Sequence, residues 1–238
     1  GMPLHCCSAN APRAFAMIPR YVYLTRSGAV DVNLLVPSSA EVKVGKNVAR
    51  LTMLTGYPQD GNSEITLECK GKPAFAMRVR IPEWAECADV RVNGVPVGDV
   101  VAGGYTVIDR IWNNGDKVSV SFEMTPWLVM LGNYQAIVRG PITLARDSRF
   151  DDGFVDEACI IPTDKDGRVE LCETAVPEDM WMAYEMEVPV GTYGNDGDMP
   201  TRVIHFCDFA SACNDWDFDR RSRVWLPRSV EVRFDSHR

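Results

Sequence analysis

Alternation of apolar and polar side chains is the feature that most limits how this chain folds. Residues 30–36, 75–81 and 118–124 each carry an apolar side chain at every second position, with residues such as Asp31, Arg78 and Ser119 between them. A period of two is typical of antiparallel strands that bury one face and leave the other exposed. The sequence therefore predicts a protein built from half-buried strands.

Turn residues separate these runs. Asn93-Gly94, Gly103-Gly104 and Asn114-Gly115-Asp116 are typical of tight connections and predict β-hairpins. The second half of the chain continues in the same way, and it predicts strands over residues 134–138, 142–145, 180–188, 203–209, 223–226 and 230–234.

Helical periodicity is almost confined to residues 9–18, and Pro19 should end that helix. The predicted fold class is therefore all-β, with two consecutive antiparallel, jelly-roll-like β-sandwiches after one short helix. We expect three parts, at residues 1–27, 28–126 and 127–238. The Asp- and Gly-rich residues 191–198 should form a long loop in the second sandwich.

Composition excludes some classes of partner. The formal net charge of −8 and the absence of a basic run argue against nucleic acid as a partner. No apolar stretch approaches the roughly 20 residues that span a bilayer, so we expect no membrane contact, and the N-terminus does not resemble a signal peptide. Bacterial cytoplasm and periplasm both stay open. The eight cysteines show no CxxC spacing and should be reduced; Cys69 should be a small buried side chain.

The adjacent Cys6 and Cys7 are the strongest candidates for chemistry. They precede the predicted helix, and the positive end of a helix dipole favours thiolate over thiol, which suits both nucleophilic attack and metal binding. Two thiolates are only half of a tetrahedral zinc shell, so a metal site would need ligands from elsewhere. The alternative interpretation is a pair of ordinary buried cysteines.

Other candidates have simple structural interpretations. His5 could support a cysteine site from outside the ligand shell, His205 should be a packed or surface histidine, and His237 lies near the C-terminus. Acidic groups could supply two glycosidase carboxylates, but acids in loops are usually solvated charges. The six tryptophans could stack on sugars or fill sandwich cores. The acidic groups are Asp151-Asp152, Asp156-Glu157 and Asp215, Asp217, Asp219; the tryptophans are Trp84, Trp112, Trp127, Trp181, Trp216 and Trp225.

A series of short segments resembles the C-terminal portion of glycoside hydrolase family 127, the β-L-arabinofuranosidase-like proteins. The first segment contains the double cysteine followed by Asn10 and Arg13, as in the family, and the others follow in the family's order over nearly the whole chain. They are HCCSANAPR (5–13), GAVDVNLLVPSSAEV (28–42), TGYPQDG (55–61), RVRIPEW (78–84), VRVNGVPV (90–97), GGYTVIDRIWNNGD (103–116), VRGPITLA (138–145) and DFASACNDWDFDRRSRVWLPR (208–228).

This resemblance implies a protein in three parts, a catalytic (α/α)6 barrel followed by two β-sandwiches. In the family a zinc ion is held by one Glu and three Cys beside a nucleophilic cysteine, and a separate Glu is the acid/base. Carried over, Cys6 would be the catalytic nucleophile and a zinc ligand, and Cys7 would be a zinc ligand. Zinc coordination would keep the Cys6 thiol deprotonated at neutral pH.

The remaining family ligands, the acid/base Glu and nearly all barrel helices precede the double cysteine, and only residues 1–5 do so here. Ser8, Ala9 and Ala11 also depart from the family's usual Pro and Gly. We therefore expect the sandwich part of a glycosidase that acts on plant-type glycans, with its helix left over from the barrel. The chain alone should bind no zinc and have no hydrolase activity.

Expected partners are a carbohydrate or the missing catalytic barrel, and exposed apolar surface should favour a homo-oligomer. One alternative is a stand-alone β-sandwich module that binds carbohydrate or mediates assembly. Exposed tryptophans around a cleft would distinguish that module. A small zinc or redox protein that uses Cys6 and Cys7 is the other alternative.

Overall fold

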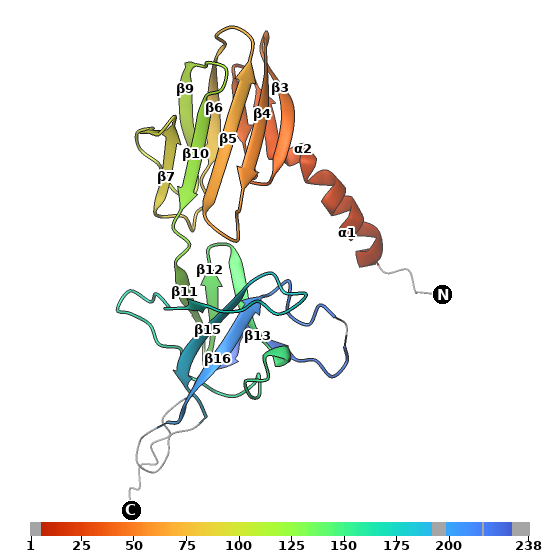
Figure 1. Cartoon of the computed structure of the whole chain (residues 1–238), viewed down its shortest axis with the longest axis vertical. Coiled ribbons are helices and arrows are strands. Elements are labelled where there is room, and N and C mark those ends of the chain that lie inside the picture. The colour runs from red at the N-terminus through yellow and green to blue at the C-terminus, as the bar shows by residue number, and fades with distance from the viewer. Residues whose placement is uncertain (1–5, 192–198, 216, 230–238) are drawn as a thin grey trace, which may run out of the picture. The chain divides into compact units, whose positions relative to one another are not determined.

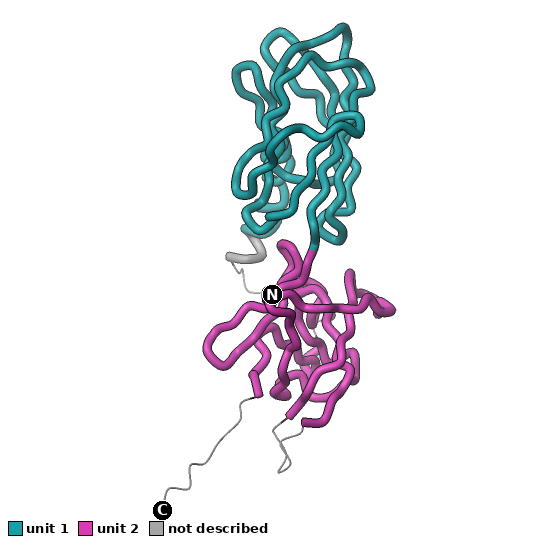
Figure 2. Tube along the Cα trace, turned by 90° about the vertical axis from the view of Figure 1, so that its left-hand side faces the viewer, with its two compact units in different colours: residues 1–124 teal, residues 125–238 magenta. Residues whose placement is uncertain are grey.

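The structure, a computed structural model, describes residues 6–191, 199–215 and 217–229, with only the backbone of residues 6–9. The chain forms two compact units, residues 1–124 (unit 1) and residues 125–238 (unit 2) (Figure 2). Strands dominate both units, so the predicted all-β fold class with sandwich-like domains is confirmed (Figure 1). The three-part division of the chain stays a prediction.

A helical segment opens unit 1. Helix α1 (Cys6–Met17) begins three residues before the predicted start, and the short helix α2 (Pro19–Val22) follows. Pro19 can begin a helix because the first turn needs no N–H from that position. The described side chains of residues 10–21 are all exposed, and Val22 is the first buried one. The helical segment therefore joins the core of unit 1 only at its C-terminal end.

Unit 1 contains a four-stranded sheet in the order β1-β2-β6-β9. The predicted alternation over residues 75–81 is confirmed in β6, where the apolar side chains are buried. Strands β2 and β6 run parallel, so the prediction of purely antiparallel sandwiches is wrong at this pair. Parallel neighbours need a long connection, and three other strands lie between these two along the chain. The sheet consists of β1 (Tyr23–Arg26), β2 (Ala29–Val32), β6 (Ala74–Arg80) and β9 (Tyr105–Ile111).

A six-stranded sheet, in the order β3-β4-β5-β10-β7-β8, forms the second layer of unit 1. All of its pairs are antiparallel. Asn93 and Gly94 both have positive φ angles, 50° and 82°, and join β7 to β8 as the predicted hairpin. The strands are β3 (Ser38–Val44), β4 (Asn47–Thr55), β5 (Asn62–Cys69), β7 (Ala88–Val92), β8 (Val95–Pro96) and β10 (Lys117–Phe122).

One continuous apolar core lies between these two sheets. Trp112, directly after β9, is fully buried, and its indole Nε1 donates to the carbonyl oxygen of Phe75 at 2.9 Å. The Phe75 ring lies 5.7 Å from the Trp112 ring, centroid to centroid. Cys69 packs against the same core as predicted, but it is only partly buried.

Two of the three predicted hairpins in unit 1 are wrong. Gly103-Gly104 leads into β9, and the strand before it, β8, lies in the other sheet. Asn114-Gly115-Asp116 carries the chain from β9 in one sheet to β10 in the other. Its backbone bonds Leu67 of β5 instead of closing two neighbouring strands, with Gly115 donating to Leu67 and Leu67 donating to Asp116. Turn residues show where a chain reverses but not which sheet it enters.

The first predicted strand also ends early. Strand β2 stops at Val32, and beyond it Leu35 is buried while Leu34 and Val36 are only half-buried. The alternation that the sequence shows through Val36 therefore runs past the strand into an irregular segment, and the predicted half-buried pattern is wrong within β2, where all four side chains, Asp31 included, are buried.

Unit 2 has one run of strands, in the order β11-β12-β13-β16-β15-β14, with the short β17 and β18 attached to β13 and β12. Strand β13 changes partners along its length. Its first residues pair with β12, whereas Leu144 and Ala145 pair with β16, and Arg146 and Asp147 pair with β17. The strands are β11 (Pro126–Leu131), β12 (Tyr134–Arg139), β13 (Ile142–Asp147), β14 (Cys172–Glu173), β15 (Ala183–Pro189), β16 (Thr201–Asp208), β17 (Ser222–Arg223) and β18 (Leu226–Pro227), with a 3-10 turn η1 (Ser148–Phe150).

The strands predicted at 134–138, 142–145 and 203–209 are confirmed by β12, β13 and β16. The strand predicted over 180–188 begins later, at Ala183, because Pro177 to Met180 form a turn. The one predicted over 223–226 is broken into β17 and β18. Residues 230–234 and nearly all of the predicted loop at 191–198 lie outside the described residues. Within the described part, no helix is long and apolar enough to cross a membrane.

Candidate functional site

The double cysteine opens helix α1. Cys6 and Cys7 are its first two residues, so the expectation that they lie in a turn before a helix starting at residue 9 is wrong by one turn. The N–H groups of a first helical turn point toward the N-terminus without intrahelical partners, which places this backbone at the positive end of the helix. The side chains of both cysteines lie outside the described part. Their roles as nucleophile and zinc ligands stay a prediction.

His205 is packed within unit 2, as the sequence predicted. Its Nδ1 lies 3.2 Å from a carboxylate oxygen of Asp152, and its Nε2 lies 3.4 Å from one of Glu185. Its ring stacks on Phe150 with 5.0 Å between centroids. Asp152 also accepts a hydrogen bond from the fully buried Arg146 at 2.7 Å. These contacts join η1 and the loop that follows it to β13, β15 and β16. His5 and His237 lie outside the described residues.

The acidic groups considered as glycosidase carboxylates have arginine partners in unit 2. Asp152 pairs with Arg146, and Asp156 pairs with Arg223 at 3.0 Å. Glu157 pairs with Arg202. Asp215 and Asp217 both face Arg220, at 3.1 and 3.7 Å. No group of three or more His, Cys, Asp or Glu side chains in the described part is arranged to hold a metal ion. For these five acids the contacts indicate a structural role, whereas the sequence had favoured solvated charges.

The tryptophans fall into two groups. Trp84 and Trp112 pack in the core of unit 1. Trp127 is half-buried under the guanidinium of Arg168, whereas Trp181 and Trp225 are exposed by 41% and 37%. Trp216 lies outside the described residues. Exposed tryptophans are therefore confined to unit 2 within the part of the chain that the structure describes.

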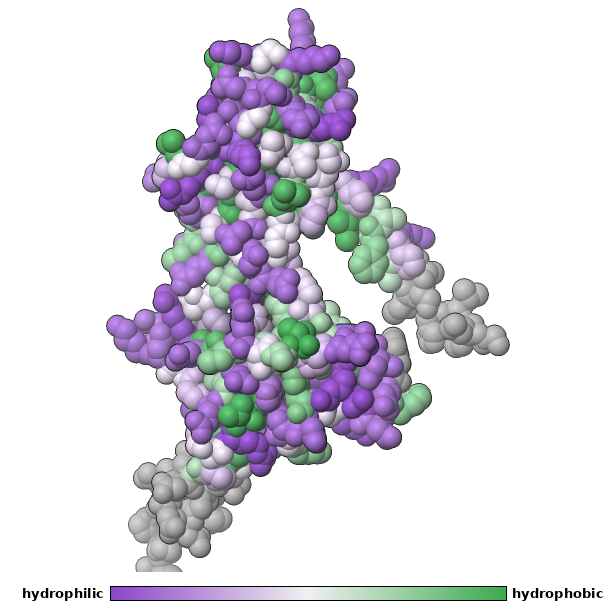
Figure 3. All heavy atoms as spheres, viewed as in Figure 1, coloured by the Kyte–Doolittle hydropathy of each residue, from purple (hydrophilic) through white to green (hydrophobic). Residues whose placement is uncertain are grey.

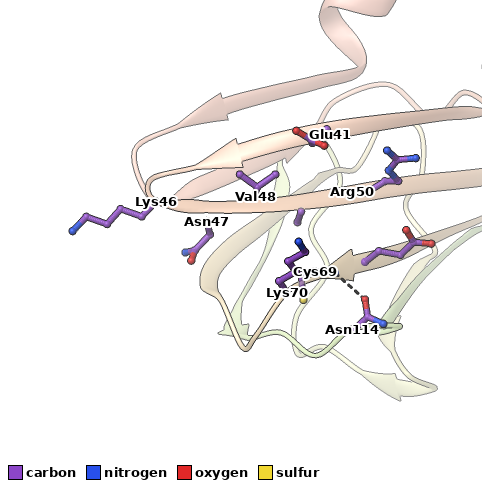
Figure 4. A pocket seen from close by; sticks show the side chains of 10 residues that line it. Glu41, Lys46, Asn47, Val48, Arg50, Cys69, Lys70 and Asn114 are labelled. Carbon is purple, nitrogen blue, oxygen red and sulfur yellow. Dashed lines mark hydrogen bonds between the residues drawn. The ribbon is translucent and has the colours of Figure 1, made fainter.

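A surface pocket of about 550 Å³ lies at one end of the six-stranded sheet of unit 1 (Figure 4). It mixes charges of both signs, with Lys46, Lys70 and Arg50 near Glu41 and Glu68. The Asn114 side-chain oxygen accepts a hydrogen bond from the backbone N–H of Cys69 at 2.9 Å. Burial, reinforced by the nearby Asp116 carboxylate, raises the pKa of the Cys69 thiol.

A raised pKa keeps Cys69 in its thiol form, which is a poor nucleophile. The thiol that lines the pocket is therefore not activated as a nucleophile, and the charged lining mixes three basic with two acidic side chains.

A narrower groove of about 360 Å³ lies on unit 2. It is lined by Leu131, Tyr134, Ser222, Arg223, Val224 and Trp225, which combines two aromatic rings with one charged and one hydroxyl side chain. The sequence did not predict this site, because its residues come from two segments almost ninety positions apart.

The chain is similar to proteins of one known family. Residues 29–124 match the family described as Beta-L-arabinofuranosidase, GH127 middle domain. A non-reducing end β-L-arabinofuranosidase from Bifidobacterium longum subsp. longum is 27% identical over 125 residues, which are 50% of this chain and 18% of that protein.

Solved structures agree with this match. The GH127 β-arabinofuranosidase BT3674 is 25% identical with a TM-score of 0.77, over 94% of this chain and 38% of its own. A GH127 β-L-arabinofuranosidase from Geobacillus stearothermophilus T6 has the same fold, with 22% identity and a TM-score of 0.77 over 94% of this chain and 37% of its own. The chain thus spans less than half the length of these relatives.

These matches make the glycoside hydrolases the class of protein to which the chain is similar. More narrowly, the chain is related to the GH127 β-L-arabinofuranosidases, and residues 29–124 correspond to the middle domain of that family. The resemblance that the short segments indicated is therefore confirmed.

Proposed function

We propose that this chain is the β-sandwich part of a GH127-type β-L-arabinofuranosidase that acts on plant-type glycans. In this proposal Cys6 and Cys7 belong to a catalytic site whose other residues come from an (α/α)6 barrel. The observation that carries it is the order of the chain: the double cysteine opens α1, and the matched middle domain begins shortly afterwards at residue 29.

Two adjacent thiols suit zinc, since soft thiolate ligands select this metal and each thiolate supplies one of four tetrahedral positions. Cys6 and Cys7 would hold the ion together with a Glu and a Cys from the barrel. Bound zinc would keep both thiols deprotonated at neutral pH. The Cys6 sulfur would then attack the anomeric carbon of the sugar, and an acid from the barrel would give a proton to the leaving oxygen.

The surface of the helical segment suits a packing role. Phe15 is 71% exposed, and Met17, Ile18 and Tyr21 are also exposed, although helices of folded proteins usually bury such a group of side chains (Figure 3). In the proposed function these side chains pack against the barrel. Where the barrel is absent, they favour association of two copies of this chain.

Two measurements on the purified chain test the proposal. Prepared without chelator, the chain should contain no stoichiometric tightly bound zinc and should not hydrolyse p-nitrophenyl β-L-arabinofuranoside when zinc is supplied. Co-production with a GH127 barrel polypeptide should restore hydrolysis, and Cys6→Ser should abolish it. Hydrolysis by the chain alone, or hydrolysis by the pair that survives Cys6→Ser, would overturn the proposed role.

A second candidate function, a stand-alone module that binds carbohydrate, is favoured by one observation. Trp225 is partly exposed and lines a groove next to a second aromatic side chain, Tyr134, so core packing does not account for it.

A further inference from the structure

The groove on unit 2 is built from two segments that the strand pairing holds in place. Tyr134 pairs with Pro227 and Gln135 pairs with Leu226, which joins β12 to β18. Gln135 is fully buried, and its side-chain amide donates to the Cys159 carbonyl at 2.7 Å. Trp225 directly precedes β18, so its backbone position relative to Tyr134 is set by these pairs. The groove is therefore formed by the fold itself.

The floor and walls of the groove are apolar and accessible. Tyr134 is 44% exposed, Trp225 is 37% exposed and Leu131 is 62% exposed. Large aromatic rings left partly in water at a concave place are typical of a binding surface rather than of a core.

The polar side chains of the groove keep unused hydrogen-bonding capacity. Arg223 uses its Nε for two partners, the Trp225 carbonyl at 3.0 Å and the Asp156 carboxylate at 3.0 Å. Its two terminal nitrogens are donors that these contacts leave unused. Within the described part of the chain, the hydroxyls of Tyr134 and Ser222 also make no hydrogen bond.

Charge decides what class of ligand fits. The carboxylate of Asp156 neutralises Arg223, so the groove presents hydrogen-bonding groups without a net charge. An anion would find no unpaired cation there, and a wholly apolar ligand would cover the Arg223 and hydroxyl donors without bonding them, which costs free energy. A neutral saccharide has both apolar C–H faces and hydroxyl groups.

We propose that the groove formed by Tyr134, Arg223 and Trp225 is a binding site for a neutral saccharide. Its volume of about 360 Å³ accommodates one or two sugar rings. The site extends the proposed function by giving the sandwich part its own contact with glycan. It does not depend on Cys6, zinc or the barrel, so it can hold when the catalytic proposal fails.

Isothermal titration calorimetry of the whole 238-residue chain with arabinotriose tests the site. We expect saturable, weak binding, because a shallow open groove gives little affinity per buried atom, on the order of 0.1–1 mM. Trp225→Ala should weaken it by about tenfold, and Tyr134→Ala by a similar factor. The matched control is Trp181→Ala, which removes a similarly exposed tryptophan of unit 2 that does not line the groove, and it should bind normally.

Three results would overturn the site. Absence of saturable binding up to about 10 mM arabinotriose would do so, as would tighter binding of trigalacturonic acid, which would show selection for an anion. Protection of Tyr134 and Trp225 by a second copy, seen as a dimer that Trp225→Ala dissociates, would assign the groove to self-association. Should Trp225→Ala unfold, Tyr134→Phe removes only a hydroxyl, and its binding should fall by about threefold. The fate of the catalytic proposal is read separately, from hydrolysis by the chain with its barrel.

Discussion

Both units bury polar side chains, but unit 1 sets a few, Asp31 and Asp116 among them, against a large continuous apolar core, whereas unit 2 combines a smaller apolar core with Gln135, Arg146, Asp147 and Asp208. The two units also differ in their balance of basic and acidic residues. Basic and acidic residues are nearly balanced in residues 1–124, whereas acidic residues outnumber basic ones almost two to one in residues 125–238. The apolar alternation of a sequence therefore accounts for more of the core of unit 1 than of unit 2, although side-chain hydrogen bonds join distant segments in both units.

Apolar packing should dominate the stability of unit 1, and Trp112→Ala should therefore be the most destabilising of the substitutions. Losing the fully buried ring and its hydrogen bond to Phe75 should lower the free energy of unfolding of unit 1 by about 4 kcal/mol. Urea unfolding followed by the amide NMR signals of unit 1 measures it. The exposed Val107→Ala is the control and should change the value by less than about 0.5 kcal/mol. A loss below about 1 kcal/mol in Trp112→Ala would contradict the role of this core.

For unit 2 the matching test is Arg146→Met, which keeps most of the side-chain volume but removes the charge. Asp152 then loses its buried partner, and the unfolding free energy of unit 2 should fall by about 3 kcal/mol. The same urea titration, read on the amides of unit 2, gives the result. Arg220→Met is the control, because its ion pairs are more exposed and should contribute less than about 1 kcal/mol. Equal losses in the two variants would show that the buried pair has no special role.

A third, smaller effect is the loss of stability of unit 2 at low pH, to which Asp147 should contribute. Burial of the Asp147 carboxyl opposes ionisation, but hydrogen bonds from the Arg149 side chain and from the backbone N–H groups of Arg149 and Cys213 outweigh it and lower the pKa of Asp147. The stabilisation is present above the ordinary Asp pKa and is lost as the pH falls through the lowered value. Asp147→Asn should therefore lower the melting temperature of unit 2 at pH 7 by about 2–6 °C, and the melting temperature of the variant should fall less steeply than that of the native chain as the pH drops below about 4. Asp166→Asn, at an exposed turn, should leave the profile unchanged, and an unchanged profile in Asp147→Asn itself would refute the assignment.

The smallest expected difference is in the reactivity of the cysteine thiols of unit 2. Burial raises the pKa of Cys207 to about 12 and that of Cys159 to about 11, whereas Cys172 lies exposed on β14. At pH 8, iodoacetamide should modify Cys172 in native protein and leave Cys159 and Cys207 unmodified until unfolding, as peptide mass spectrometry would show. Cys172→Ser should not change stability measurably. Early modification of Cys207 would mean that this part of the core opens easily.

Local patterns predicted the strands but not all of their partners. The alternation over 75–81 and the Asn93-Gly94 pair predicted β6 and the β7–β8 hairpin, because those features depend on neighbours in sequence. The crossover at residues 114–116 was missed, since a turn has the same residues whether it closes a hairpin or changes sheet. No pattern in the sequence near either strand indicates the parallel pairing of β2 with β6.

The same limit applies to the candidate sites. The double cysteine was found because its residues are adjacent, and its proposed role came from the family resemblance. The groove of unit 2 was not found, because Tyr134 and Trp225 meet only after β12 and β18 pair. Arg146 likewise carries no signal in a strand pattern, since its burial depends on Asp152 in the following loop.

The parallel pairing of β2 with β6 also has a consequence for synthesis on the ribosome. Strand β2 (Ala29–Val32) leaves the ribosome before its neighbour in the sheet, β6 (Ala74–Arg80), which emerges only after more than forty further residues. Until then β2 can pair only with β1, and the exposed helical segment ahead of it precedes a sheet that is still incomplete. Strand β2 therefore completes its place in the sheet only after β6 has been made, and a nascent chain halted before residue 74 should be a target for chaperones.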